Sequence, residues 1–158
     1  MNAIASKQMN AVADNEAPVS GWWDGSAHLY PLRVYYADTD AGGVVYHARY
    51  LDFAERARTE MMRSIDDGGH YRTDGRGMLI LVRSAEIDYR KPAALDDVLT
   101  VHTRLLRVGG ASFALEQQIW RQDVILAVLK ITLVCVNAMG HPTRIPDGLR
   151  EKLAGLIS

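Results

Sequence analysis

The chain has little cysteine, no surplus of either charge and no long hydrophobic run. Its single cysteine, Cys135, cannot form a disulfide within the chain. The 18 lysine and arginine residues nearly balance the 19 aspartate and glutamate residues, which gives a formal net charge of −1. This balance argues against nucleic acid as a partner, because polyanions are usually bound by an excess of basic side chains.

The longest apolar run, residues 124–136, is interrupted by Lys130 and is too short to cross a bilayer as a helix. Residues 1–20 contain no continuous hydrophobic stretch, so no secretory signal and no transmembrane segment are predicted. Cys135 lies inside the apolar run, where a small buried hydrophobic residue is expected. These absences together predict a soluble cytoplasmic protein.

Several catalytic motifs are also missing. The sequence contains no G-x-S-x-G elbow, no H-E-x-x-H helix and no cysteine pair that would suit zinc. The glycine-rich stretch over residues 68–77 is not a phosphate-binding P-loop, because no Gly-Lys-Ser/Thr follows it. We therefore expect neither a metal nor a cofactor.

A chain of 158 residues with 48% hydrophobic content is long enough to bury one sizeable core. Residues 1–26 show no hydrophobic period and are predicted to form a flexible leader, which leaves residues 27–158 as a single domain. The adjacent Trp22 and Trp23 are the exception, because two indoles are costly to leave in water. They are expected to pack on the domain or on a neighbouring subunit.

Hydrophobic periodicity predicts one long helix among several strands. Apolar residues alternate over residues 30–36, and a helical stripe follows from near Tyr46 to residue 65. Four more strands are predicted over residues 81–90, 99–105, 113–119 and 124–136. Gly109 and Gly110 are expected to form a tight hairpin turn with positive φ angles. A mobile loop over residues 64–77 and a short last helix opening at Pro146 complete the order.

These elements satisfy burial best in an α+β fold, with an antiparallel sheet of about five strands curled around the long helix. A more specific clue lies between the first strand and the helix. There the sequence reads RVYYADTDAGGVVYH, which places an acid and a histidine just before a helix start. A helix N-terminus offers unpaired backbone N–H groups and a partial positive charge, which suit a developing oxyanion.

This segment resembles the signature of the 4-hydroxybenzoyl-CoA thioesterase family of hotdog-fold proteins. Arg33-Val34, Thr39-Asp40 and Gly43-Val44-Val45 fill its slots. The similarity is greatest to the Tol-Pal-associated acyl-CoA thioesterases of the YbgC type, which share the flanking Tyr-Tyr and Glu-Arg-Ala-Arg-Thr-Glu. The resemblance runs from about residue 30 to about residue 137. It implies the hotdog fold and the hydrolysis of a thioester.

The resemblance assigns the catalytic carboxylate to Asp40, which acts as a nucleophile or as a general base. It also places an oxyanion-binding N–H at His47, whose ring either assists the reaction or only satisfies structural partners. Gly43, Val44 and Tyr46 are expected to contact substrate, although Tyr46 equally suits a place in the core.

Other polar residues have competing interpretations. Asp38 is expected to cap a turn, and Glu55 to be a polar helix residue, although one branch of hotdog thioesterases uses a helical carboxylate. Arg107 is the cation expected at the phosphates of coenzyme A. Arg83, Arg90 and Lys91 are further candidates for the same role, although isolated surface cations are common.

The sequence therefore predicts an acyl-CoA thioesterase that releases a free carboxylic acid and coenzyme A. The thiol carrier is coenzyme A or acyl carrier protein, and the assembly is a homodimer or homotetramer. The alternative from another class is a non-catalytic acyl-CoA-binding hotdog module. Asp40 and the lack of a DNA-binding segment disfavour it. A hotdog dehydratase is disfavoured because the order and spacing of Asp40 and His47 do not suit that group.

Overall fold

The computed structural model describes residues 17–66 and 78–157. Along the chain the elements are α2 (Ala17–Ser20), β1 (Trp22–Asp24), β2 (Ala27–Arg33), the 3-10 helix η1 (Tyr36–Asp38), α3 (Arg49–Ile65), β3 (Leu79–Tyr89), β4 (Val98–Val108), β5 (Ser112–Arg121), β6 (Val124–Val136) and α4 (Asp147–Ala154). Within these residues no helix is long and apolar enough to cross a membrane.

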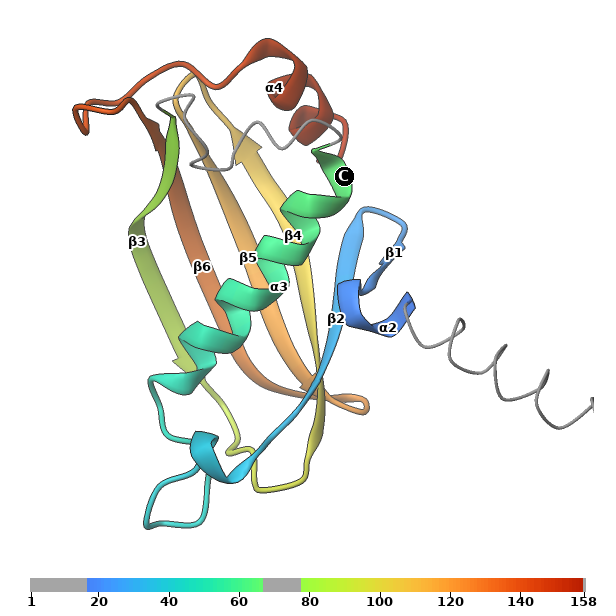
Figure 1. Ribbon diagram of the computed structural model, residues 1–158. Helices are drawn as coiled ribbons and strands as arrows, with labels where there is room; N and C mark the ends of the chain where they lie inside the picture. The colour runs from blue at the N-terminus through green and yellow to red at the C-terminus, as the bar shows by residue number, and fades with distance from the viewer. Residues whose placement is uncertain (1–16, 67–77, 158) are drawn as a thin grey trace, which may run out of the picture.

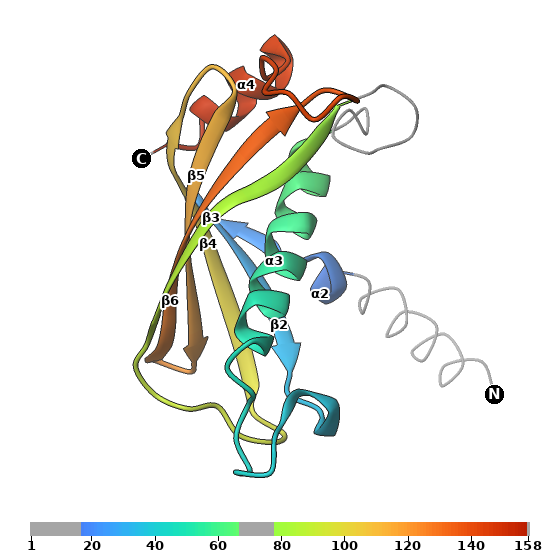
Figure 2. The same ribbon diagram turned by 90° about the vertical axis from the view of Figure 1, so that its left-hand side faces the viewer.

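The strands form one antiparallel sheet of six strands in the order β1-β2-β4-β5-β6-β3. Helix α3 lies across one face of this curved sheet, and α4 lies beyond one end of it (Figure 1). The turned view shows the sheet bending around α3 (Figure 2). The predicted α+β hotdog arrangement is confirmed, with one strand more than expected.

The additional strand comes from the segment predicted to be a flexible leader. Strand β1 pairs with β2 through Trp22 opposite Leu29, and the turn between them contains Gly25 at a φ of 58°. Trp23 packs against the core and its indole N–H donates to the Ser64 hydroxyl at 3.1 Å. The expected packing of this tryptophan on the domain is confirmed. Residues 1–16 of the predicted leader lie outside the described residues.

The core lies between α3 and the sheet. The buried face of α3 repeats at helical spacing and comprises Tyr50, Phe53, Ala54, Ala57, Met61, Met62 and Ile65. Gln117 and Thr103 are buried polar residues beneath it: the Gln117 side-chain amide donates to the Ala54 carbonyl at 2.8 Å and to the Thr103 hydroxyl at 3.0 Å. These bonds fix the middle of α3 over the centre of the sheet.

The predicted turns are present with different details. The β4–β5 hairpin is closed by the Gly109 N–H, which donates to the Ser112 carbonyl at 2.7 Å, but neither Gly109 nor Gly110 has a positive φ. The turn into β6 instead places Gln122 at a φ of 54°. In the predicted loop over residues 64–77, the first two residues belong to α3, and residues 67–77 lie outside the described residues.

Candidate active site

The segment that carries the sequence signature is a small hairpin rather than a direct passage from strand to helix. Thr39 pairs with Val45, and the Asp40 N–H donates to the Val44 carbonyl at 3.0 Å. The Gly43 N–H returns to the Asp40 carbonyl at 3.0 Å, and Gly43 adopts a φ of 78° that favours glycine. The hairpin therefore closes on itself at one end of the molecule.

Helix α3 begins at Arg49, three residues later than Tyr46, where the sequence pattern placed it. Two backbone bonds hold Val45 and Tyr46 outside the helix, and a turn over residues 46–49 then leads into it. The Val45 N–H donates to the Ala93 carbonyl, and the Tyr46 N–H donates to the Asp38 carbonyl, both at 2.8 Å. Similarly, β2 ends at Arg33, short of the predicted residue 36, and η1 begins at Tyr36.

Asp38 and Asp40 occupy different environments. Asp38 is buried, and its carboxylate accepts the Tyr35 N–H at 2.9 Å, so its predicted role as a cap is confirmed. Asp40 is exposed, and one carboxylate oxygen accepts the Gly42 N–H at 2.8 Å. The second oxygen of Asp40 has no hydrogen-bond partner among the described residues, which leaves it available to a ligand.

His47 lies just before α3 and is exposed. Its carbonyl accepts the Tyr89 hydroxyl at 2.7 Å, and its ring lies 4.4 Å from the Tyr46 ring, measured between centroids. Across the described part of the chain, the backbone N–H groups of His47 and Ala48 donate to no protein atom. No hydrogen bond joins the His47 ring to Asp40 in the same part of the chain.

A hollow of about 310 Å³ opens beside His47. Its walls combine aromatic and aliphatic side chains with two cations, and its lining is Val45, His47, Tyr50, Tyr89, Arg90, Lys91 and Pro92. Tyr50 and Tyr89 meet edge to face at 5.4 Å between ring centroids, and burial raises the pKa of both phenols. An apolar hollow with a few polar groups at its edge is the usual form of a small-molecule site.

Of the other predicted substrate contacts, Gly43, Val44 and Tyr46 lie near Asp40 in the chain, and Arg107 lies far from it. Gly43 and Val44 lie in the hairpin with Asp40, and Tyr46 follows it with its side chain 45% exposed. Arg107 lies near the far end of β4, about 30 Å along the strand from the end next to the hairpin. Within one protomer the fold therefore does not bring Arg107 to Asp40.

Sequence reasoning missed the aromatic walls of the hollow. The sequence pattern predicts Tyr50 on the apolar face of the helix and Tyr89 in a strand, and both predictions are confirmed. The signal that could have drawn attention to Tyr89 is its place next to Arg90 and Lys91 at the end of a strand.

A second hollow, of about 240 Å³, lies between α3 and the start of β3. It contains Glu55, whose carboxylate accepts the Thr59 hydroxyl at 2.8 Å, and Arg58. The Arg58 Nη1 atom is buried and has no hydrogen-bond partner within the described residues. Burial lowers the pKa of the Arg58 guanidinium, and the negative charge of Glu55 opposes this effect only in part.

Comparison with known proteins identifies the family of the chain. A family model for the thioesterase-like superfamily matches residues 34–153. The chain is 44% identical over 108 residues to the acyl-CoA thioesterase YbgC of Haemophilus influenzae, covering 68% of this chain and 79% of that protein. It is 39% identical over 127 residues to the acyl-CoA thioester hydrolase YbgC of Escherichia coli, covering 76% and 90%.

Among solved structures, a probable thioesterase from Bartonella henselae superimposes with a TM-score of 0.68 at 39% sequence identity, covering 76% of this chain and 99% of that one. The chain belongs to the thioesterase-like superfamily. It is accordingly an enzyme of the thioesterase class, and the resemblance noted in its signature segment is confirmed. Among the described residues, no three His, Cys, Asp or Glu side chains gather as metal ligands would.

Proposed function

We propose that the protein hydrolyses acyl-CoA thioesters, with Asp40 as the reacting carboxylate. The observation that carries this proposal is the hairpin that presents an exposed Asp40 close in sequence to unpaired backbone N–H groups at the start of α3. The names of the relatives from Haemophilus influenzae and Escherichia coli support coenzyme A as the thiol. Acyl carrier protein remains the alternative carrier.

Two routes are open to Asp40. As a nucleophile, its carboxylate oxygen attacks the thioester carbon, the C–S bonding pair leaves with sulfur, and water then hydrolyses the resulting anhydride. As a general base, it takes a proton from water while the water oxygen attacks, and later returns that proton to the leaving thiolate. In both routes the N–H groups of His47 and Ala48 are the donors that would stabilise the oxyanion.

Arg90 and Lys91 suit the phosphates of coenzyme A because both line the hollow beside His47. Tyr50 and Tyr89 would then flank the apolar part of the same molecule. Arg107 can contribute only if a second protomer brings it to this end of the sheet, since its own protomer holds it at the far end. We therefore expect Arg90 and Lys91 to contribute more than Arg107 to binding the phosphates of coenzyme A.

The proposal is tested by thiol release from short, long and aromatic acyl-CoAs, measured for the wild type and for Asp40→Asn. The amide can still accept the Gly42 N–H, so folding should persist while the charge is lost. We expect kcat to fall by a factor of about 10² to 10⁴, as is usual when a positioned acid–base group is removed. Equal turnover in the two proteins would refute the role of Asp40.

Asp38→Asn is the matched control, because it makes the same chemical change two residues away. Asp38 is buried against the Tyr35 N–H, so its substitution should cost about 0.5 to 2 kcal/mol of stability and much less turnover. Glu55→Gln tests the helical carboxylate, which lies in a hollow with Arg58. A large loss of kcat for Glu55→Gln, with no loss for Asp40→Asn, would identify Glu55 rather than Asp40 as the reacting carboxylate.

The rival proposal, a non-catalytic acyl-CoA-binding module, makes a distinct prediction in the same assay. Such a protein would bind acyl-CoA, as seen by calorimetry, and release no thiol from any member of the panel. Substitution of Asp40 would then change affinity alone.

We also propose that the protein forms a dimer through β3. Among the described strands, β3 is at the edge of the sheet and pairs with β6 alone, and its Leu81 and Val82 are 45% and 48% exposed. The buried, unpaired Nη1 of Arg58 lies in the hollow beside this edge, where a second copy can supply an acceptor. Light scattering at micromolar concentration checks this, and a fully active monomer would contradict it.

A further inference from the structure

A short segment between β3 and β4 contacts both sides of the candidate site. The Ala93 carbonyl accepts the Val45 N–H at 2.8 Å, and the Ala93 N–H donates to the Tyr50 hydroxyl at 3.0 Å. The next residue, Ala94, pairs with Val44 of the hairpin. One residue, Ala93, therefore ties the hairpin that carries Asp40 to the first turn of α3.

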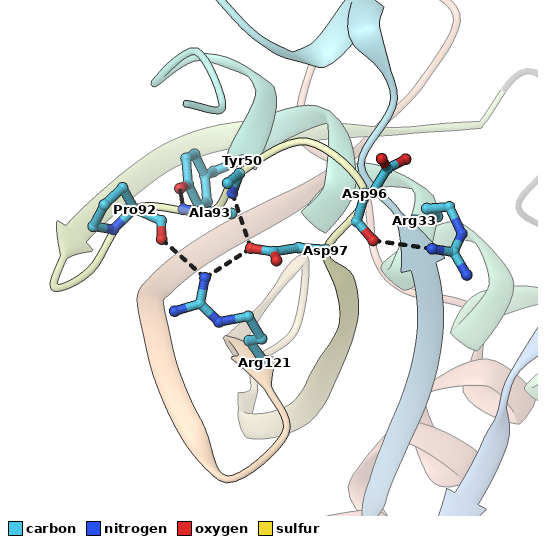
Figure 3. A network of polar contacts seen from close by, with 8 residues as sticks. Arg33, Tyr50, Pro92, Ala93, Asp96, Asp97 and Arg121 are labelled. Carbon is cyan, nitrogen blue, oxygen red and sulfur yellow. Dashed lines mark hydrogen bonds and ion pairs between the residues drawn. The ribbon is translucent and has the colours of Figure 1, made fainter. Parts of the chain in front are cut away.

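This segment is in turn held by an ion pair from another part of the sheet. Arg121, at the end of β5, contacts the Asp97 carboxylate at 2.7 Å, and the same carboxylate oxygen accepts the Ala94 N–H at 2.9 Å. The Arg121 guanidinium also reaches the Pro92 carbonyl at 3.4 Å. Figure 3 shows Asp97 between the segment and Arg121, with Tyr50 above Ala93. The Asp97–Arg121 pair therefore forms hydrogen bonds to the segment on both sides of Ala93, at Pro92 and at Ala94.

The charges favour this arrangement. Burial alone would raise the pKa of Asp97, but the Ala94 N–H and the Arg121 guanidinium together lower it. Both side chains are only partly exposed, at 35% for Arg121 and 21% for Asp97. Water screens this partly buried ion pair less than it screens an exposed one such as Arg144–Asp147, so the Asp97–Arg121 pair should hold its geometry more firmly.

We propose that Asp97 and Arg121 are positioning residues for thioester hydrolysis, acting through Ala93 on Val45 and Tyr50. The inference rests on the proposed function. Neither side chain lines the hollow beside His47, so neither is placed to touch the reacting atoms. They fix the position of Val45, where the Asp40 hairpin ends just before His47. They also fix Pro92 and Tyr50, which line the hollow beside His47. A displacement of about 1 Å at such positions can cost on the order of 100-fold in rate.

The test is Arg121→Gln, which removes the charge and shortens the reach to Asp97. We expect kcat to fall by about 10-fold to 100-fold with a smaller change in KM, because orientation rather than affinity is lost. Arg121→Lys keeps the charge and should recover part of kcat. Arg144→Gln is the matched control, since it breaks an ion pair with Asp147 in which both side chains are 75% exposed. It should leave kcat unchanged.

A second readout does not depend on substrate. The Val45 amide is protected from hydrogen exchange by the Ala93 carbonyl, so Arg121→Gln should accelerate its exchange while amides in the centre of the sheet keep theirs. Unchanged Val45 exchange in the variant would overturn the proposal even if activity falls. If the wild type has no thioesterase activity but the variant still shows faster Val45 exchange, the proposed function is refuted. The structural coupling from Arg121 through Ala93 to Val45 is then still supported.

Tyr50→Phe completes the design because it removes the other hold on Ala93. If Arg121 and Tyr50 act through the same peptide, the loss in kcat for the double variant should differ from the product of the single losses. Independent, multiplicative losses would show that Arg121 acts by another route. All comparisons are made well below the unfolding temperature of each variant, so that a lower folded fraction does not imitate a lower kcat.

Discussion

His28 should make the protein sensitive to mild acid. Its side chain is 1% exposed, lies 5.2 Å from the Trp23 ring between centroids, and has an Nδ1 atom with no partner within the described part of the chain. Burial lowers the pKa of His28, and the Ser20 carbonyl and the charge of Glu60 oppose this only in part. A second proton on the ring would be buried without an acceptor.

The direction of the effect follows from proton linkage. With its pKa lowered in the folded state, His28 binds fewer protons there than in the unfolded chain, where the ordinary value of 6.5 applies. Stability is therefore complete above pH 6.5 and is lost as the pH falls toward the folded-state pKa. One such group costs about 1.4 kcal/mol per pH unit in that window, so His28 contributes at most about 1.4 kcal/mol between pH 7.5 and pH 5.5.

The measurement is urea unfolding, followed by tryptophan fluorescence, at several pH values and one protein concentration. Replacing His28 by leucine should flatten the dependence of the unfolding free energy on pH by about this amount. The pKa of His102 is also lowered, by burial and by Arg104, but this group is present in both proteins and cancels in the comparison. His141→Gln, in an exposed turn, is the control. Parallel curves for the wild type and His28→Leu would refute the reasoning.

Three further substitutions test other parts of the fold. His47→Ala should lower kcat more than it raises KM if the ring assists the reaction; a change in KM alone would indicate a binding role. Gly43→Ala should cost about 1 to 2 kcal/mol in urea unfolding, since a φ of 78° disfavours a side chain although the space around it is open. Trp23→Phe should cost about 0.5 to 1.5 kcal/mol through the lost bond to Ser64, and an unchanged unfolding midpoint would contradict that.

Periodicity is clearest in the elements that bury one face, although it also located β3, which has no fully buried residue. Strand β4 alternates Leu99 and Val101 toward the core, and α3 repeats its apolar face over four turns, so pattern alone located both. The start of α3 lies later than the pattern predicts because the Val45 and Tyr46 N–H groups bond to Ala93 and Asp38, outside the helix. Such bonds outside regular helix and strand ladders leave no periodic signal.

The same reason limits prediction of the site. Asp40 and His47 were found through a local signature, and their chemical roles stay predictions until tested. Asp97 and Arg121 are 24 residues apart and each stands beside a turn, where polar residues are ordinary. Arg107 was chosen for its charge, and only the length of β4 shows that it lies at the wrong end of its own protomer.

The two edges of the sheet differ in a way that limits how far copies can associate by adding strands. Strand β1 has three residues and is flanked by Gly21 and Gly25, both with positive φ, so it offers little regular backbone to another chain. Strand β3 has eleven residues. If two copies pair through β3, each uses its long edge and only the two short edges remain. The N-terminal hairpin would thus act as a terminator, which favours a closed pair over an open fibre.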